Sequence, residues 1–305
     1  MIPEPKEKNK SSDIRRLPEW FKVKAPGSEN YLSIKKKIQN FKLNTVCEEA
    51  ACPNIGECWD RGTATFMILG DTCTRACSYC NVKTGWPITV DKSEPIRVSQ
   101  TIKNMDLKYA VITSVDRDDL EDYGSDIFRD TILNSKKINP ECKIEVLIPD
   151  FEGDFISLKK VVNAKPDVLN HNIETTRRVF RKVRPRGNYD LSLKLLSNVK
   201  KINEYMPTKS GMMVGLGETM PEIIETMNDL RSVNCDLLTI GQYLRPSKNH
   251  HPLIKFYTPK EFKELEKIGL DLGFNHVASG PLVRSSYHAD EQHDAAIENL
   301  LNLSK

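Results

Sequence analysis

The chain has 305 residues, 39% of them hydrophobic and 29% charged, and its formal net charge is +3. This length is enough to bury a sizeable core without disulfide bonds, as one large domain or two small ones. No apolar run approaches the roughly 20 residues that a membrane-spanning helix needs, and the N-terminal region has no hydrophobic stretch of the signal-peptide kind. Composition therefore argues against membrane and exported proteins, and we expect a cytoplasmic one.

The N-terminal region has a basic and irregular pattern. Prolines interrupt residues 1–28, and residues 1–37 carry more Lys and Arg than Asp and Glu. A basic arm of this kind can hold nucleic acid or an acidic protein partner, or it can remain a solvated tail. Residues 29–43 are expected to form a basic helix.

Six of the eight cysteines lie between residues 47 and 80. They form two triplets, Cys47-x4-Cys52-x5-Cys58 and Cys73-x3-Cys77-x2-Cys80. In a chain that is not exported, cysteines this closely spaced indicate a metal site or catalysis rather than a disulfide framework. Proline and glycine between the cysteines of the first triplet predict a loop there.

From residue 64 onward, short apolar β-rich runs alternate with longer segments of helical periodicity. The predicted strands are Thr65–Leu69, Tyr109–Val115, Ile144–Ile148, Val168–Ile173, Gly211–Leu216 and Leu237–Tyr243. Capping boxes at Thr219–Glu222 and Thr258–Glu261 predict the starts of two helices. Alternating strands and helices predict a parallel sheet with right-handed crossovers, and six β/α units favour a barrel or part-barrel.

Polar residues gather where the predicted strands end. In a parallel barrel the functional groups lie at these carboxyl ends. The polar runs are Asp116–Asp119, His171–Thr175, Gly215–Glu218 and Gln242–Arg245. They predict a ligand site, although helix capping and tight turns remain alternatives for the aspartates and the glycines. Cys142 and Cys235 precede predicted strands, so we expect ordinary buried residues at the opposite end.

The spacing of the second cysteine triplet points to an iron–sulfur cluster. A cubane cluster has four irons and normally four thiolate ligands, so three thiolates on one loop leave one iron open to a substrate or cofactor. Structural zinc, which usually takes four Cys or His ligands, is the alternative, but the nearest histidine, His171, is far away in the sequence. For the first triplet, a zinc site completed by Cys142 or Cys235 also remains open.

The x3-x2 spacing is typical of the radical S-adenosylmethionine (SAM) superfamily, and the chain resembles the lipoyl synthase family within it. The stretches that carry the resemblance are Thr45–Trp59, Gly70–Cys80, Thr113–Leu120, His171–Thr175, Val183–Pro185, Lys209–Glu218 and Gly280–Ala289. The x4-x5 cysteine triplet combined with Arg284-Ser-Ser-Tyr287 is specific to this family. The resemblance therefore covers nearly the whole chain.

The resemblance implies an α/β fold, a partial (β/α)6 TIM-type barrel of the radical SAM type with N-terminal and C-terminal extensions. We expect residues 1–63 to carry the first cysteine loop, residues 64–275 to form the barrel, and residues 276–305 to supply a serine ligand. The resemblance also implies two [4Fe-4S] clusters. Cys73, Cys77 and Cys80 would hold the cluster that binds SAM. Cys47, Cys52 and Cys58 would hold an auxiliary cluster, with Ser286, or less plausibly Ser285, as its fourth ligand.

Contacts to SAM can be carried over to four further residues. Asn172 and Glu174 would reach its ribose or methionine part, while Gly215 and Gly217 would let the backbone approach it closely. Because one strand separates the two cysteine triplets, we expect both clusters at the same mouth of the barrel, with an alkyl chain between them. Candidates for carboxylate contacts, or for surface ion pairs, are Arg184, Arg245 and Arg284.

The family inserts sulfur at C6 and C8 of an octanoyl chain attached to a lysine, and the sulfur comes from the auxiliary cluster. The implied partners are octanoylated lipoyl carrier domains (2-oxoacid dehydrogenase E2 subunits and the glycine cleavage H protein), a flavodoxin or ferredoxin as electron donor, and an iron–sulfur carrier, but neither nucleic acid nor a membrane. The alternatives are another sulfur-inserting radical SAM enzyme, similar to biotin synthase or the methylthiotransferases, and a non-catalytic iron–sulfur or zinc protein that senses redox state.

Overall fold

The computed structural model describes residues 17–22, 27–28, 31–32, 34–36, 44–45, 54–87 and 89–294. Within these residues one sheet has the strand order β1-β2-β5-β6-β7-β8-β9-β10. Its strands are β1 (Asn44–Thr45), β2 (Thr63–Ile68), β5 (Tyr109–Ser114), β6 (Lys143–Leu147), β7 (Val168–Asn170), β8 (Thr208–Val214), β9 (Leu237–Gln242) and β10 (His276–Gly280). Neighbours from β2 to β10 pair in parallel, and β1 pairs antiparallel with β2.

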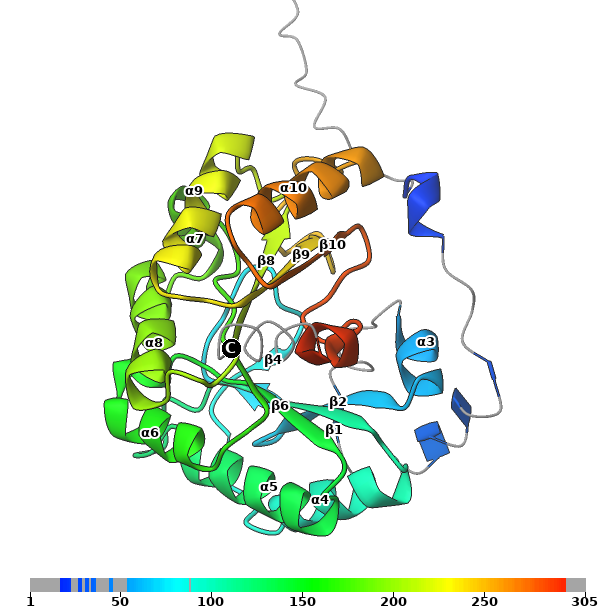
Figure 1. The fold of residues 1–305 in the computed structure, drawn as a ribbon, viewed down its shortest axis with the longest axis vertical. Helices are drawn as coiled ribbons and strands as arrows, with labels where there is room; N and C mark the ends of the chain where they lie inside the picture. The colour runs from blue at the N-terminus through cyan, green and yellow to red at the C-terminus, as the bar shows by residue number, and fades with distance from the viewer. Residues whose placement is uncertain are drawn as a thin grey trace, which may run out of the picture.

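The strands of this sheet are short and almost entirely buried. Strands β2 and β9 are buried along their whole length, and β5 and β8 nearly so. Parallel strands that are covered on both faces carry continuous apolar runs rather than an alternating pattern. The helices that surround the sheet in Figure 1 provide the outer cover, which explains why the predicted strands were recognisable as unbroken apolar segments.

Helices alternate with the strands, as the sequence pattern predicts. They are η1 (Glu19–Phe21), α3 (Ile55–Asp60), α4 (Glu94–Asn104), α5 (Ser125–Ile138), η2 (Phe151–Gly153), α6 (Phe155–Asn163), α7 (Arg177–Val183), α8 (Tyr189–Ile202), α9 (Met220–Ser232) and α10 (Pro259–Asp271). Both predicted capping boxes are formed, at the starts of α9 and α10. Each box pairs backbone N–H groups that a helix start leaves without a partner, so it fixes where the helix begins.

The predicted fold class, a partial TIM-type barrel, is confirmed. The six predicted strands correspond to β2, β5, β6, β7, β8 and β9. The sequence prediction missed β10, which extends the sheet by pairing in parallel with β9 and comes from the segment assigned to the C-terminal extension. Helix α3 and the last described segment, red in Figure 1, lie at the side of the barrel between β2 and β10.

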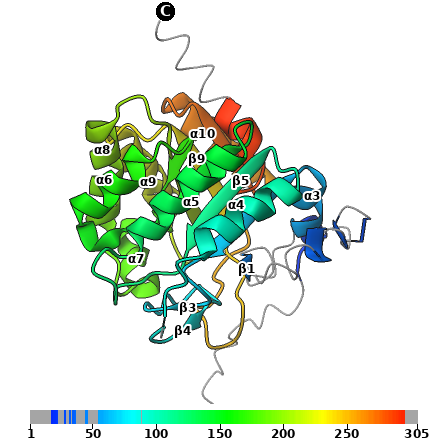
Figure 2. The same ribbon diagram turned by 90° about the horizontal axis from the view of Figure 1, so that it is seen from below.

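The last described residues, 289–294, are helical and cover the N-terminal ends of the strands. Ala289 packs with Tyr109 and Val111 at the start of β5, and the ring of His293 meets that of Tyr109 with centroids 6.1 Å apart. In Figure 2 this segment lies on the side opposite β3 (Thr72–Cys73) and β4 (Lys83–Thr84), the small parallel pair that marks the carboxyl ends.

A buried ion pair lies at the same N-terminal end of the strands. The side chains of Lys209 and Glu145 are 0% and 1% exposed, with Nζ 3.1 Å from Oε1. Tyr109 Oη and Asn170 Nδ2 also donate hydrogen bonds to the carboxylate, at 2.9 and 3.1 Å. Burial lowers the pKa of Lys209, and Glu145 opposes that shift. Buried ions are tolerated when every partner is present, as here.

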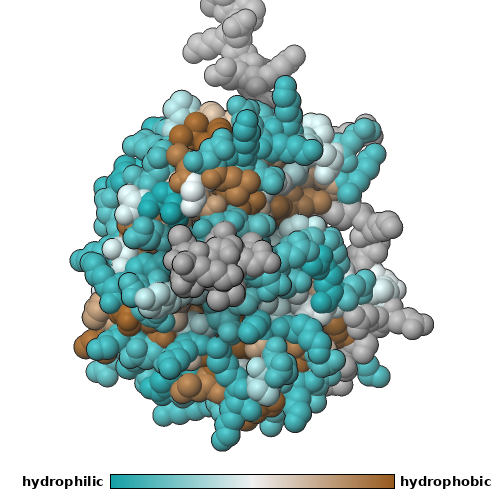
Figure 3. Space-filling view, viewed as in Figure 1, coloured by the Kyte–Doolittle hydropathy of each residue, from teal (hydrophilic) through white to brown (hydrophobic). Residues whose placement is uncertain are grey.

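Polar and charged residues dominate the face seen in Figure 3. Among the described helices, none is long and apolar enough to cross a membrane.

Candidate active site

A cavity of about 170 Å³ lies at the carboxyl ends of the strands. Its lining comprises Cys73, Arg75, Cys77, Tyr79, Cys80, Val82, Thr84, Thr113, Ser114, Val115, Asp116, Leu147, Ile148, Pro149, His171, Asn172, Glu174 and Arg184. All three cysteines of the second triplet belong to this lining, together with Asn172 and Glu174. The structure therefore brings together five of the residues predicted for the SAM site.

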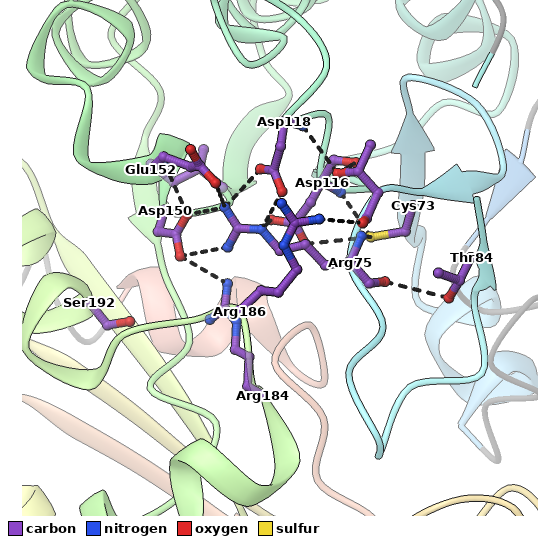
Figure 4. Close-up of polar contacts among 12 residues, drawn as sticks. Cys73, Arg75, Thr84, Asp116, Asp118, Asp150, Glu152, Arg184, Arg186 and Ser192 are labelled. Carbon is purple, nitrogen blue, oxygen red and sulfur yellow. Dashed lines mark hydrogen bonds and ion pairs between the residues drawn. The ribbon is translucent and has the colours of Figure 1, made fainter. Parts of the chain in front are cut away.

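Arg75, between the first two cysteines of this loop, ties the loop to the barrel (Figure 4). Its side chain is 1% exposed. The guanidinium donates two hydrogen bonds to Asp118, both of 2.8 Å, and two to Asp150, both of 2.7 Å. Bidentate arginine–carboxylate pairs fix orientation as well as position, so the shape of the loop is set by the protein itself. No sequence pattern marked Arg75 or Asp150.

Backbone contacts hold the same loop at further points. Thr74 N donates to Asp116 O at 3.0 Å, and Thr74 Oγ1 accepts a bond from Asp118 N at 3.1 Å. Ser78 N donates to Val183 O at 2.8 Å. The polar run after β5, Asp116–Asp119, therefore anchors the cysteine loop. The sequence had predicted only ligand binding or helix capping for this run.

Burial controls the acidity of the three thiols. Cys73 Sγ accepts bonds from the N–H groups of Arg75 and Asp116, both at 3.4 Å, yet burial and the Asp116 carboxylate raise its pKa to about 11. Burial raises the pKa of Cys77 to about 12 and that of Cys80 in the same direction. Coordination to a metal cation deprotonates such thiols outright, so metal binding here would release protons.

The lining of this cavity combines both signs of charge. Glu174 has a left-handed backbone, with φ of 66°, and bridges to Met212 of β8. Burial raises the pKa of Glu174, and Arg184 opposes the rise. The side chain of Arg184 is 6% exposed and lies 3.5 Å from Asp150. A cavity with a guanidinium and carboxylates on its walls suits a ligand that carries both an ammonium and a carboxylate group.

His171 lines this cavity as a structural residue. Its Nδ1 lies 2.8 Å from Ile148 O and its Nε2 lies 3.0 Å from Ser192 Oγ. Burial lowers its pKa to about 4, so the ring is neutral at pH 7. Because both ring nitrogens already have partners, His171 is not available to complete a zinc site.

Gly215 and Gly217 do not line the cavity. Their φ angles are 102° and 109°, a region that favours glycine. The carboxylate of Glu218 accepts bonds from Gly215 N at 2.6 Å and Leu216 N at 2.9 Å. A Cβ on Gly215 would lie 2.2 Å from Gln242 Nε2. The tight-turn alternative thus explains both glycines, and their contact with SAM stays a prediction.

A second, smaller cavity lies between residues from the N-terminal and the C-terminal parts of the chain. It is lined by Asn54, Ile55, Cys58, Thr63, Thr65, Arg284, Ser286 and Tyr287. Cys58 comes from α3 and Ser286 from the segment after β10, so a predicted thiol ligand and the predicted serine ligand share one site. Cys47 and Cys52 lie outside the described residues.

The two serines of the Arg284–Tyr287 motif have different surroundings. Ser285 Oγ donates to Asn172 Oδ1 at 3.1 Å. A Cβ on Gly211 of β8 would lie 3.0 Å from Ser285 Oγ. Ser285 therefore lies against the strands that form the larger cavity, whereas Ser286 lines the smaller one with Cys58. This arrangement favours Ser286 as the ligand.

Known proteins match nearly the whole chain. The radical SAM superfamily profile matches residues 67–230, and the profile of the N-terminal domain of lipoyl synthase matches residues 3–52. A lipoyl synthase from Bacillus cereus is 54% identical over 291 residues, 95% of this chain and 98% of the relative. The chain belongs to the lipoyl synthase family. A lipoyl synthase from Shouchella clausii is 52% identical over 295 residues, 96% of both chains.

Solved structures share the fold at low sequence identity. Methylornithine synthase matches with a TM-score of 0.52 and 15% identity, over 79% of this chain and 81% of that structure. Streptococcus suis SuiB bound to S-adenosylmethionine matches with a TM-score of 0.53 and 10% identity, over 72% of this chain and 50% of that structure. These similarities support the radical SAM barrel and nothing more specific.

One expectation drawn from the spacing of the two triplets is wrong for the described ligands. Cys58 and Ser286 do not lie at the mouth that holds Cys73, Cys77 and Cys80, because they line a separate cavity beside β2. The smaller cavity includes Thr63 and Thr65 from the first half of β2, whereas Cys73 follows the end of that strand. A six-residue strand is roughly 17–20 Å long, so the two cavities lie at different depths along the barrel.

The remaining cysteines of this family member occupy the places expected for them. Cys142 and Cys235 are buried just before β6 and β9, at the N-terminal end of the barrel. Burial raises the pKa of each thiol to about 12. Among the candidate arginines, only Arg184 lines the larger cavity; Arg284 lines the smaller one, and exposed Arg245 donates to the carbonyls of Lys248 and His250.

Proposed function

We propose that this protein catalyses the lipoyl synthase reaction, the insertion of two sulfur atoms at C6 and C8 of an octanoyl chain on a carrier-protein lysine. One observation carries the proposal: the barrel has two cavities with predicted cluster ligands, one with Cys73, Cys77 and Cys80 and one with Cys58 and Ser286. A radical SAM enzyme with a single cluster has no use for the second set.

The donor set of the larger cavity fits a [4Fe-4S] cluster better than zinc. In the described part of the chain, no three His, Cys, Asp or Glu side chains converge closely enough to hold one metal ion. Zinc needs such convergence, whereas each thiolate of a cubane binds a different iron, so the thiolates surround a volume. Cys73, Cys77 and Cys80 would hold this cluster, which supplies the radical chemistry together with SAM.

The residues around that cluster site would bind and orient SAM. Asn172, Glu174 and Arg184 are proposed to contact its polar groups, because they line the same cavity as the three cysteines. Val115, Leu147 and Ile148 provide apolar walls, which suit an alkyl chain and exclude water. Arg75 keeps the cysteine loop in place through Asp118 and Asp150.

The auxiliary [4Fe-4S] cluster would lie at the smaller cavity, where the described residues enclose about 10 Å³. Its proposed ligands are Cys47, Cys52, Cys58 and Ser286, and the cavity lined by Cys58 and Ser286 supports the last two. A serine oxygen is a harder and less usual ligand for iron than thiolate. Such a corner is suited to a cluster that gives up its sulfur and has to be rebuilt.

The proposed partners follow from this chemistry. They are octanoylated lipoyl carrier domains (the E2 subunits and H protein named above), a flavodoxin or ferredoxin that supplies electrons, and an iron–sulfur carrier that rebuilds the auxiliary cluster. We propose action in the cytoplasm, where cysteine ligands stay reduced. We also propose the division into residues 1–63, 64–275 and 276–305, with the last part adding β10 to the sheet before it supplies Ser286.

The experiment that tests this function is the iron content of anaerobically reconstituted protein, beside a variant in which Cys73, Cys77 and Cys80 are all changed to Ala. We expect about eight irons per chain, falling to about four in the variant, because two independent cubanes contribute four each. Sulfur insertion into an octanoyl-lysyl peptide then follows as the activity assay.

Two results would contradict the proposal. Stoichiometric zinc, or a single cluster that survives the triple change, would mean that the ligands are misassigned. A redox-sensing protein that only binds a cluster would not cleave SAM, so 5′-deoxyadenosine formed by the reduced protein excludes that alternative.

A further inference from the structure

The residues directly after Ser286 contact the helix that carries Cys58. Tyr287 Oη donates to the Glu57 carboxylate, 3.2 Å from each oxygen. His288 Nε2 lies 2.9 Å from Glu57 Oε1. Glu57 immediately precedes Cys58 in α3, and Tyr287 immediately follows Ser286. These contacts therefore join the two neighbours of the predicted ligands.

A second set of contacts lies one helical turn further along α3. Arg61 Nη2 donates to Asp290 Oδ2 at 3.1 Å and to Glu291 Oε1 at 2.6 Å. Glu291 Oε2 is also 3.0 Å from His288 Nδ1, which links the two sets into one network. We call it the α3 latch; its members are Glu57, Arg61, Tyr287, His288, Asp290 and Glu291.

The α3 latch is exposed to solvent, in contrast to the contacts on either side of it. The side chains of Arg61, Glu57 and Glu291 are 35%, 51% and 54% exposed, and exposed ion pairs contribute little each and weaken with salt. Asn54 Nδ2 donates to Leu282 O at 2.6 Å and is buried, and Ala289 is 0% exposed. Residues 283–288 thus lie between two buried anchors, and the latch holds them against α3.

We propose that the α3 latch positions Ser286 beside Cys58 and sets how readily this serine leaves the auxiliary site. The inference rests on the proposed function, because it takes Ser286 as a ligand of the auxiliary cluster. An enzyme that consumes and rebuilds a cluster needs a ligand that is held while the cluster is intact and released when the cluster is opened. A network of exposed contacts provides this, since each contact breaks and re-forms easily.

The test uses the variant with Cys73, Cys77 and Cys80 changed to Ala, which retains only the auxiliary cluster. Iron release to bathophenanthroline sulfonate is followed with and without Arg61→Ala. We expect the iron content to stay at about four and the release rate to rise about three- to tenfold. Arg61→Lys keeps one charge but not the two-carboxylate geometry, so it should recover part of the difference.

The chain offers a matched control in Arg129 of α5. Its side chain is 38% exposed and also contacts two carboxylates, Asp126 at 2.7 Å and Asp130 at 2.8 Å. Arg129→Ala should leave the release rate unchanged. A measurement without metal complements the iron-release rate. Backbone hydrogen exchange of residues 283–288 should be faster in the Arg61→Ala apoprotein than in the apoprotein of its parent.

The outcomes separate the inference from the proposed function. Iron release and hydrogen exchange that match the parent in Arg61→Ala would overturn the latch, as would equal acceleration by Arg129→Ala. A triple cysteine variant that holds no iron at all would instead count against the auxiliary cluster itself, and so against the proposed function.

Discussion

The two segments that carry predicted cluster ligands are attached to the barrel in opposite ways. The Cys73–Cys80 loop is fixed by Arg75, a buried cation with four short hydrogen bonds to two aspartates. The Ser286 segment is held to α3 by Arg61, whose side chain is 35% exposed. We interpret the difference as a division of labour: a site that persists through turnover is built on buried charge, and a site that is renewed is closed by exposed contacts.

The largest effect is expected from Arg75→Met, because it removes the guanidinium that donates two hydrogen bonds each to buried Asp118 and Asp150 and leaves Asp150 with Arg184 alone. Removing one partner of a buried ion pair costs about 3–5 kcal/mol. We expect a loss of this size in the free energy of unfolding of the metal-free protein in urea, together with loss of the iron bound by Cys73, Cys77 and Cys80. Arg75→Lys keeps the charge but not the paired geometry. Its stability and iron content should lie between those of the parent and those of Arg75→Met. A loss below about 1 kcal/mol, the range of exposed pairs, would remove the contrast between the two segments.

The buried ion pair of Lys209 and Glu145, which holds no segment with predicted cluster ligands, sharpens the same comparison. Lys209→Met should destabilise the fold by about 3 kcal/mol, because Glu145 is left unpaired, yet the folded protein should bind its full iron. Adding Glu145→Leu should recover part of the stability, since an apolar pair replaces the lone charge. Urea unfolding and iron analysis of both variants check this. Iron loss in Lys209→Met would mean that general destabilisation, rather than release of the cysteine loop, accounts for iron loss in Arg75→Met.

The adjacent serines should separate stability from metal binding. Ser285→Ala removes one hydrogen bond to Asn172 and should cost about 1 kcal/mol, with the iron content unchanged. Ser286→Ala should leave stability nearly unchanged but speed iron release from the auxiliary site. Both variants are compared in the triple cysteine background by urea unfolding and chelator kinetics. The reverse pattern would identify Ser285 as the ligand.

The smallest effect is expected from the double change of Cys142 and Cys235 to Ala. Both thiols have pKa values raised to about 12 by burial, so at pH 8 they stay protonated and unreactive. Iodoacetamide should label neither cysteine in the folded parent protein. The iron content of the double variant should match that of the parent. Iron loss in the double variant would revive the zinc or mixed-ligand alternative for the first triplet.

Much of the fold was predictable because it depends on local patterns. Continuous apolar runs identified β2 and β5 to β9, and the capping boxes fixed the starts of α9 and α10. Strand β10 was missed because its residues, His276–Gly280, include only one β-branched residue and end in serine and glycine. Its place in the sheet comes from pairing with β9, which is a tertiary effect.

The site was predictable only where a motif marked it. Cysteine spacing led to the larger cavity, and the polar residues after β7 led to further residues of its lining. Nothing local connects Arg75 with Asp150, because that contact joins residues 75 positions apart. The glycines after β8 do not line the larger cavity, and the Glu218 turn accounts for their positive φ angles without any ligand, so their contact with SAM stays a prediction.

The hydrogen bond between Asn54 and Leu282, which spans 228 positions, has a consequence for biogenesis. A ribosome makes the lining of the larger cavity, residues 73–184, long before it reaches Ser286. The smaller cavity closes only once residues on both sides of the bond have emerged. During translation, therefore, every residue that lines the first cavity has been made while one side of the second is still missing.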